Sequence, residues 1–389
     1  MSELLNGRWA ETKEALLEGL QGTKKSVMGV TLENTRKYLM ESPTAGATSA
    51  GNVATLNRVI LPVIRRVMPT VIANELVGVQ PLAGPVGQIH TLRIRYSDTS
   101  TNAGVVAGEE ALSPFKIAEA YSGNTATGKA ASTATLEGQA GNRMSIQILK
   151  QTVEAKTRKL SARWTFEAAQ DAQAQQAIDV EAEIMAALAQ EITAEIDQEI
   201  LASLSSLAGA ASQTYDQAQV SGTATFVGDE HAALAIQINR VSGLIAQRTR
   251  RGAGNWAVVS PIALTILQSA TTSAFARTTE GTFEAPTNTK FVGTLNNALK
   301  VYVNSYANDS TPILVGYKGG SESDAAAFYC PYIPLMSSGV VLDPSTFEPT
   351  VSFMTRYGYV ELSNSASSLG NAADYLGKVA IADGNVKFS

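Results

Sequence analysis

Residues 176–208 read QAIDVEAEIMAALAQEITAEIDQEILASLSSLA, and this stretch decides the fold. Apolar side chains recur in it at every fourth position, which places them along one side of an α-helix. No proline interrupts the stretch, Gly209 follows it as a stop signal, and Ala, Glu and Gln fill the other faces. We therefore expect one long helix of about 50 Å. Its apolar stripe consists of Val180, Ile184, Leu188, Ile192, Ile196, Ile200 and Leu204.

The polar face of this expected helix carries one sign of charge, because Lys and Arg are absent from Trp164 to Asn239. An exposed helix usually mixes signs and gains pairs between residues four apart. The pattern therefore predicts a positive partner elsewhere, and the alternative is a face that is merely solvated. The acidic residues are Asp179, Glu181, Glu183, Glu191, Glu195, Asp197 and Glu199.

Composition narrows the class of protein. With 389 residues, 44% of them hydrophobic, the chain can bury a core and divide into two or three domains. A net charge of -5 without a basic stripe argues against a nucleic-acid-binding protein. The single cysteine, Cys330, excludes a disulfide framework and fits a reducing compartment. The charged N-terminus lacks an apolar signal core and no run of 18 apolar residues occurs, so we expect a soluble, intracellular protein with no membrane partner.

The N-terminal region divides at a composition boundary. Residues 1–41 show short amphipathic helical patterns with six acidic and six basic residues. The following SPTAGATSAGN, residues 42–52, is too small and polar to pack a core. We therefore expect residues 1–41 to be a separable element, tethered rather than integrated. In residues 52–85, prolines break a helical pattern into short helices, and Gly84 with Pro85 marks a turn into extended structure.

The rest of the chain predicts a long hairpin and a mixed domain. Residues 86–163 contain a strand at 89–96 and a returning stretch at 144–163, and residues 116–142 are too polar to bury themselves, which predicts a mobile tip. Over 230–334, strands and helices alternate, with GNWAVVSPIALTILQ predicting a buried strand and a helix that begins at Ser260 and Pro261. The segment 335–362 is expected to return as strands that pack on the long helix. The placement of residues 374–388 stays open.

The sequence shows no site for cofactor, metal or covalent catalysis. His90 and His231 lack metal-ligand spacing, and no phosphate-binding glycine motif occurs. Cys330 between Tyr329 and Pro331 is typical of a small buried side chain rather than a nucleophile. We therefore expect no enzyme and no cofactor. The rival hypothesis, an enzyme built on the α/β domain at 230–334, requires a pocket with convergent polar groups.

Two stretches resemble one known family. NVATLNRVILPVIRRVMPTVIANELVGVQPLAGPVGQIHTLRIRY, residues 52–96, resembles the N-terminal core of the major capsid proteins of T-even-type bacteriophages and related cyanophages. FMTRYGYVEL, residues 353–362, is similar to their C-terminal strand region. The resemblance implies an α+β fold of the Hong Kong 97 phage capsid type, with a long spine helix, an extended β-hairpin loop, and peripheral and axial domains. The T-even relatives are longer, so their insertion domain is expected to be absent or reduced here.

The resemblance implies six parts. They are a cleavable N-terminal segment (1–41), an N-terminal arm (42–85), an extended loop (86–163), a peripheral domain (164–229) with the spine helix at 176–208, an axial domain (230–334), and returning peripheral strands with a C-terminal element (335–389).

A short motif marks a candidate processing site. Leu39 and Glu41, followed by Ser42, resemble the hydrophobic-x-Glu site at which T-even-type prohead proteases cut their capsid proteins. The motif falls at the composition boundary found above, and exposed linkers are where proteolysis concentrates. Leu16 and Glu18 form a second match. We expect the cut after Glu41.

The resemblance implies self-assembly into hexamers and pentamers of an icosahedral or prolate head shell, built in the cytoplasm of a bacterial host. The shell of the virion would enclose double-stranded DNA without sequence-specific binding. Other partners would be a scaffolding protein, the prohead protease, and vertex, portal and possible decoration proteins. A paralogous vertex protein and a bacterial encapsulating shell protein remain alternatives. The expected inter-subunit contacts join the acidic helix to the basic loop through Glu191, Glu195, Glu199, Lys116, Lys129 and Arg143.

Overall fold

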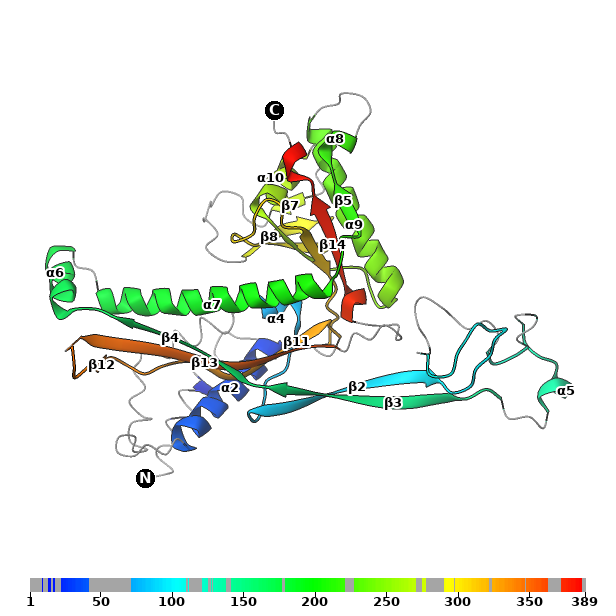
Figure 1. The fold of residues 1–389 in the computed structure, drawn as a ribbon, viewed down its shortest axis with the longest axis horizontal. Helices are drawn as coiled ribbons and strands as arrows, with labels where there is room; N and C mark the ends of the chain where they lie inside the picture. The colour runs from blue at the N-terminus through cyan, green and yellow to red at the C-terminus, as the bar shows by residue number, and fades with distance from the viewer. Residues whose placement is uncertain are drawn as a thin grey trace. The chain divides into compact units, whose positions relative to one another are not determined.

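The computed structural model forms two compact units (Figure 1). Unit 1 comprises Met1–Gly87, Val153–Ser203 and Phe328–Val360, and unit 2 comprises Gln88–Thr152, Leu204–Ala327 and Glu361–Ser389. The structure describes residues 9, 13–14, 17, 22–41, 71–109, 111, 121–124, 127, 129–137, 141–176, 179–220, 227–270, 275–277, 290–296, 298–321, 324–346, 348–362 and 372–386.

The expected long helix is present as α7 (Val180–Leu207), 28 residues or about 42 Å long. Its apolar stripe is buried from Leu188 to Leu204, with Ile200 and Leu204 fully inaccessible, and is partly buried at Val180 and Ile184. The helix begins later than residue 176 because Asp179 caps it: its Oδ1 accepts the N–H groups of Glu181 at 3.1 Å and Ala182 at 3.4 Å. Gly209, at a φ of +69°, ends it. A separate helix, α6 (Phe166–Gln176), precedes it.

Unit 1 is built on a five-stranded sheet with the order β1-β11-β13-β12, in which β4 also pairs with β13. In the antiparallel pairing of β4 with β13, Arg163 lies opposite Thr350 and Lys156 opposite Tyr357. Burial alternates along β13, so one of its faces points into the core. The strands are β1 (Gly78–Val79), β4 (Lys156–Arg163), β11 (Ala327–Ser337), β12 (Val341–Leu342) and β13 (Pro349–Glu361), and the short helix α4 (Ala73–Leu76) precedes β1.

The N-terminal segment is integrated into unit 1, which corrects the expectation of a merely tethered element. Helix α2 (Gly22–Glu41) buries one face that includes Val27, Met28 and Leu32. Asn34 is also buried and donates hydrogen bonds to backbone carbonyls of the sheet region. The sequence did not predict this buried face, because its apolar residues are interspersed with the acidic and basic residues of 1–41.

The returning half of the hairpin is two strands, because the chain changes partner at Ala155, whose N–H donates to the Pro85 carbonyl at 2.9 Å. β3 (Met144–Glu154) pairs with β2 (Val86–Tyr96) in a two-stranded ribbon, whereas β4 joins the sheet of unit 1. The expectation that residues 116–142 bury nothing is wrong at Tyr121, which belongs to a small core of its own. That core consists of Tyr96, Ala103, Val105, Ala111 and Tyr121. The short helix α5 (Thr133–Leu136) is exposed.

Unit 2 contains a seven-stranded mixed sheet with the order β5-β14-β10-β6-β9-β8-β7. Helices α9 (Val227–Thr249) and α10 (Pro261–Ser269) share one apolar core with it. The predicted start of α10 is confirmed, since Ser260 accepts the N–H of Ala263 at 3.3 Å and Pro261 occupies the first turn. The strands are β5 (Gln213–Tyr215), β6 (Trp256–Val259), β7 (Phe275–Arg277), β8 (Lys290–Leu295), β9 (Leu299–Val303), β10 (Ile313–Gly316) and β14 (Leu376–Ile381), with a helical turn α8 (Gln217–Val220) after β5.

The C-terminal element, left open by the sequence, is β14. It lies between β10 and β5, antiparallel to the first and parallel to the second. The domain expected at 230–334 therefore also recruits residues 213–215 and 376–381, while β11 belongs to unit 1. None of the helices among the described residues combines the length and apolarity that a membrane span requires.

Candidate functional site

Two of the residues weighed for chemistry, Cys330 and His231, are buried, whereas His90 is exposed on β2. Cys330 is buried, and desolvation raises the pKa of its thiol to about 12, so the reactive thiolate is disfavoured. His231 is 1% exposed and its Nδ1 lies 2.6 Å from Ser269 Oγ. Within the described ranges, no group of three or more His, Cys, Asp or Glu is placed to hold a metal ion.

A polar cluster in unit 1 joins β4 and β13 to the long helix. Arg158 on β4 donates from Nη1 to Glu195 Oε2 at 2.6 Å, from Nη2 to Glu199 Oε2 at 2.5 Å, and from Nε to the Tyr357 hydroxyl at 2.6 Å. The Tyr357 hydroxyl in turn donates to Glu199 Oε2 at 2.5 Å. Burial alone raises the pKa of Glu199, but hydrogen bonds from Arg158 and Tyr357 outweigh it and hold the pKa below its ordinary value.

The positive partner of the acidic face was expected in the basic loop of a neighbouring subunit, whereas for two of its residues the structure supplies one within the same chain. Glu195 and Glu199 both pair with Arg158 of the same subunit, in the sheet that packs beside α7 (Figure 1). Reversing their charge would therefore disturb folding as well as any contact between subunits. The segment 335–362 was expected to return as strands on the long helix, and its strand β13 contacts α7 through the hydrogen bond from Tyr357 to Glu199.

The other predicted contact residues are more scattered. Glu191 is exposed on α7. Lys129 is exposed in a small turn, where its carbonyl accepts the N–H of Asn124 at 2.9 Å. Arg143 pairs with Asp98 at 3.2 Å beside the small hairpin core, and its hydrogen bonds lower the pKa of Asp98. Lys116 lies outside the described residues.

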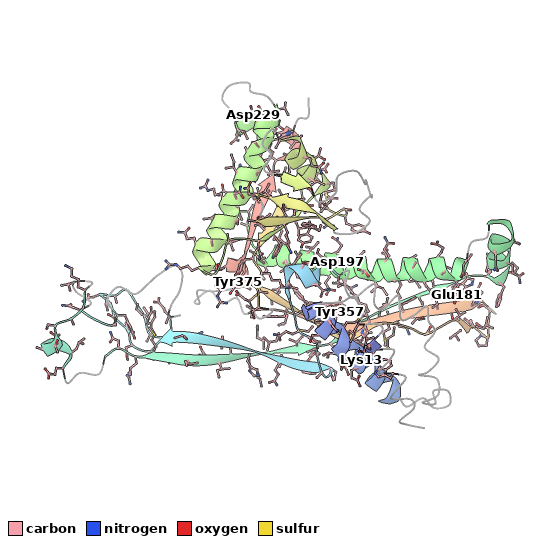
Figure 2. All side chains as sticks on the ribbon, turned by 180° about the vertical axis from the view of Figure 1, so that it is seen from behind. Lys13, Glu181, Asp197, Asp229, Tyr357 and Tyr375 are labelled. Atoms are coloured by element: carbon pink, nitrogen blue, oxygen red, sulfur yellow. The ribbon has the colours of Figure 1, made fainter. Side chains whose placement is uncertain are left out.

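Asp197 was assigned to the polar face of the helix, and the structure buries it at 1% exposure instead (Figure 2). Its Oδ1 accepts the N–H of Ile72 at 2.9 Å, and within the described chain its Oδ2 has no hydrogen-bond partner. Desolvation raises its pKa to about 7. The signal was available in the sequence, because Asp197 lies four residues from both Thr193 and Leu201, which form a second buried row.

The buried Asp197 should make folding stability depend on pH. The folded chain retains a proton that the unfolded chain releases between about pH 4 and pH 7, so stability falls as pH rises through this window and is level above it. Asp197→Asn keeps an oxygen acceptor for Ile72 but has no proton to lose. We expect the free energy of unfolding of the variant, relative to that of the parent, to increase by about 2 to 4 kcal/mol as the pH rises from 4 to 8. Denaturant unfolding of both proteins at several pH values measures this, and parallel stability curves would contradict it.

The hairpin carries an apolar row that the sequence interpretation missed. Met144, Ile146 and Ile148 alternate along β3 and share one face of the strand. Their exposed fractions are 52%, 67% and 64%. The signal was the period-two pattern in MSIQI, which is typical of a strand with one covered face.

The candidate processing motif lies at the end of α2. Leu39 and Glu41 belong to its last turn, and Ser42 lies outside the described residues. Proteases bind extended chain, and helix ends fray.

Comparison with known proteins identifies the family. The family described as Major capsid protein Gp23 matches residues 53–136 and 110–381. The major capsid protein of Vibrio phage KVP40 is 30% identical, over 85% of this chain and 81% of that protein. The major capsid protein of Enterobacteria phage T4 is 29% identical, over 81% of this chain and 76% of that protein.

Solved capsid structures are also similar. The capsid structure of cyanophage P-SCSP1u has a TM-score of 0.47 at 11% identity, covering 80% of this chain and 88% of that one. The capsid of Myoviridae phage XM1 has a TM-score of 0.45 at 11% identity, covering 80% and 91%. The expected resemblance is confirmed by the sequence matches, and the α+β class by the two mixed units described above. The chain belongs to the Gp23 family, the major capsid proteins of T-even-type tailed phages.

Proposed function

We propose that this chain assembles into hexamers and pentamers that close into an icosahedral or prolate head shell around double-stranded DNA. The exposed row of Met144, Ile146 and Ile148 is the observation that carries the proposal. A two-stranded ribbon is marginally stable by itself, and an uncovered apolar face in a ribbon favours association. A second copy of this chain is the occupant that we assign to the row, because family members assemble with their own copies.

Charge supports the same proposal only weakly. Glu191 and Lys129 have exposed side chains and remain candidates for a contact between subunits. Glu195, Glu199 and Arg143 already pair within their own subunit, so they contribute less. An exposed ion pair is worth on the order of 0.2 to 1 kcal/mol, which sets register more than affinity. Apolar contacts repeated around closed rings would supply the binding free energy.

Maturation by a prohead protease is the second part of the proposal. Hydrolysis after Glu41 would sever the covalent link between residues 1–41 and the rest of the chain and make the change irreversible. Assembly would also involve scaffolding, portal and vertex proteins, and decoration proteins could bind the finished shell. We propose no catalytic role and no cofactor for the chain.

Electron microscopy of the expressed chain tests the proposal. We expect closed shells, or rings of five and six subunits, and an intact-mass loss that matches residues 1–41 after a prohead protease is added. Rings of five alone would favour the vertex paralogue. Shells from a chain that the prohead protease leaves uncut would favour the encapsulating shell. A uniform monomer or dimer at every salt concentration would contradict assembly and favour the rival hypothesis of an enzyme.

A further inference from the structure

Helix α2 is docked on unit 1 through one face. Val27, Met28 and Leu32 are 5%, 2% and 1% exposed, and Thr31 between them is fully buried. Lys25 and Ser26, which precede these residues in the helix, are exposed. This face is therefore covered within unit 1, and Asn34 joins the helix to the sheet region there.

Asn34 gives this docking surface its polar specificity. Its side-chain amide is buried and donates to the Leu82 carbonyl at 2.7 Å and to the Tyr332 carbonyl at 3.0 Å. Both carbonyls lie just beyond the paired residues of β1 and β11. There the two chain segments are still joined by the hydrogen bond from the Leu82 N–H to the Pro331 carbonyl at 3.0 Å. A primary amide with two N–H groups can satisfy two acceptors from one residue. If α2 left, both carbonyls would lose these donors.

The residues before α2 are attached to the helix itself. Glu33 on α2 accepts hydrogen bonds from Lys13 Nζ at 3.2 Å and from Trp9 Nε1 at 3.4 Å. Lys13 and Trp9 are therefore held by α2 through Glu33. Among the described residues, the hydrogen bonds that join α2 to the sheet region come from Asn34, several residues away from the bond after Glu41.

We propose that this surface of unit 1 is a binding site for residues 22–41 as a separate chain, so that the cut after Glu41 does not by itself release them. Hydrolysis leaves a new carboxylate at Glu41, which meets the negative end of the helix dipole and loosens the last turn only. The burial of residues 27–32 and both bonds of Asn34 persist. Release is then slow unless unit 1 changes shape, which separates cutting from departure in time. The biological setting rests on the proposed processing, whereas the site is present in the uncut chain.

An unrelated protease makes the test independent of phage processing. A recognition sequence for a site-specific protease is placed in the linker 42–52 of the full chain, and the chain is cut at that sequence. Size-exclusion chromatography with mass spectrometry then follows the fragment. We expect it to elute with the body of the protein. Separation of the fragment within the time of the column run would overturn the proposal.

Exchange of a labelled peptide tests the role of Asn34 without altering the body. A fluorescent peptide of residues 22–41 is mixed with the cut complex, and anisotropy reports its binding. We expect the unaltered peptide to exchange into the site, Asn34→Ala to bind at least about tenfold more weakly because two hydrogen bonds are lost, and Lys25→Ala to bind like the parent. Equal binding of the Asn34→Ala peptide would overturn the assigned site. Neither result bears on cleavage after Glu41 or on shell assembly, which are tested separately.

Discussion

Glu41→Ala is expected to give particles that retain residues 1–41 in every subunit and that do not fill with DNA. The proposed protease reads a hydrophobic residue and a glutamate before the bond, and the variant removes the glutamate while keeping a residue that favours helix at the end of α2. Intact mass of purified particles measures the retained segment, and electron microscopy measures the fraction of full heads.

Glu18→Ala is the matched control, because Leu16 and Glu18 form the second copy of the motif. We expect this variant to be cut after Glu41 and to give full heads. Mature heads from Glu41→Ala would remove the processing hypothesis at this position. A block in Glu18→Ala with normal processing of Glu41→Ala would move the site to the earlier motif, where a cut leaves the whole of α2 attached.

The double variant Ile146→Thr with Ile148→Thr is expected to abolish closed shells while leaving the subunit folded. Burying an isoleucine side chain is worth about 1.5 to 3 kcal/mol, and this contribution would recur at every copy of the contact. Threonine keeps the β-branched shape that suits a strand, so the ribbon should persist. Sedimentation and electron microscopy measure assembly, and circular dichroism measures folding.

The control for this variant changes the opposite face of the same strand. Ser145→Thr with Gln147→Thr introduces the same residue at alternate positions and should leave assembly unchanged. A normal yield of shells from the isoleucine variant would show that the apolar row is not an interface. A loss of shells from both variants would point to a general defect of the ribbon.

The sequence predicted the parts of the fold that depend on one regular period. The step-of-four stripe of α7 and the cap formed by Ser260 and Pro261 depend on local spacing, and both are present in the structure. The placement of β14 depends on pairing with strands far away in the sequence, which local spacing does not encode. The sequence did not predict the docking of α2 for a related reason. Asn34 donates to carbonyls that lie 48 and 298 residues away along the chain.

The candidate site was predicted less well than the fold. Charge in the sequence showed that the acidic face needs a positive partner, but it did not show whether that partner lies in the same chain. Arg158 answers this for Glu195 and Glu199. The prediction was wrong for Asp197, because its row on the helix, with Thr193 and Leu201, is buried although its side chain is acidic.

The pairing of Arg158 with the acidic face has a consequence for the particle outside its host. Charges that are neutralised inside each subunit are no longer available to join one subunit to the next. The proposed interface then depends on apolar contact, which dissolved ions screen far less than they screen exposed charge pairs. A head built in this way should hold together when it passes into strong salt, where exposed charge pairs are screened.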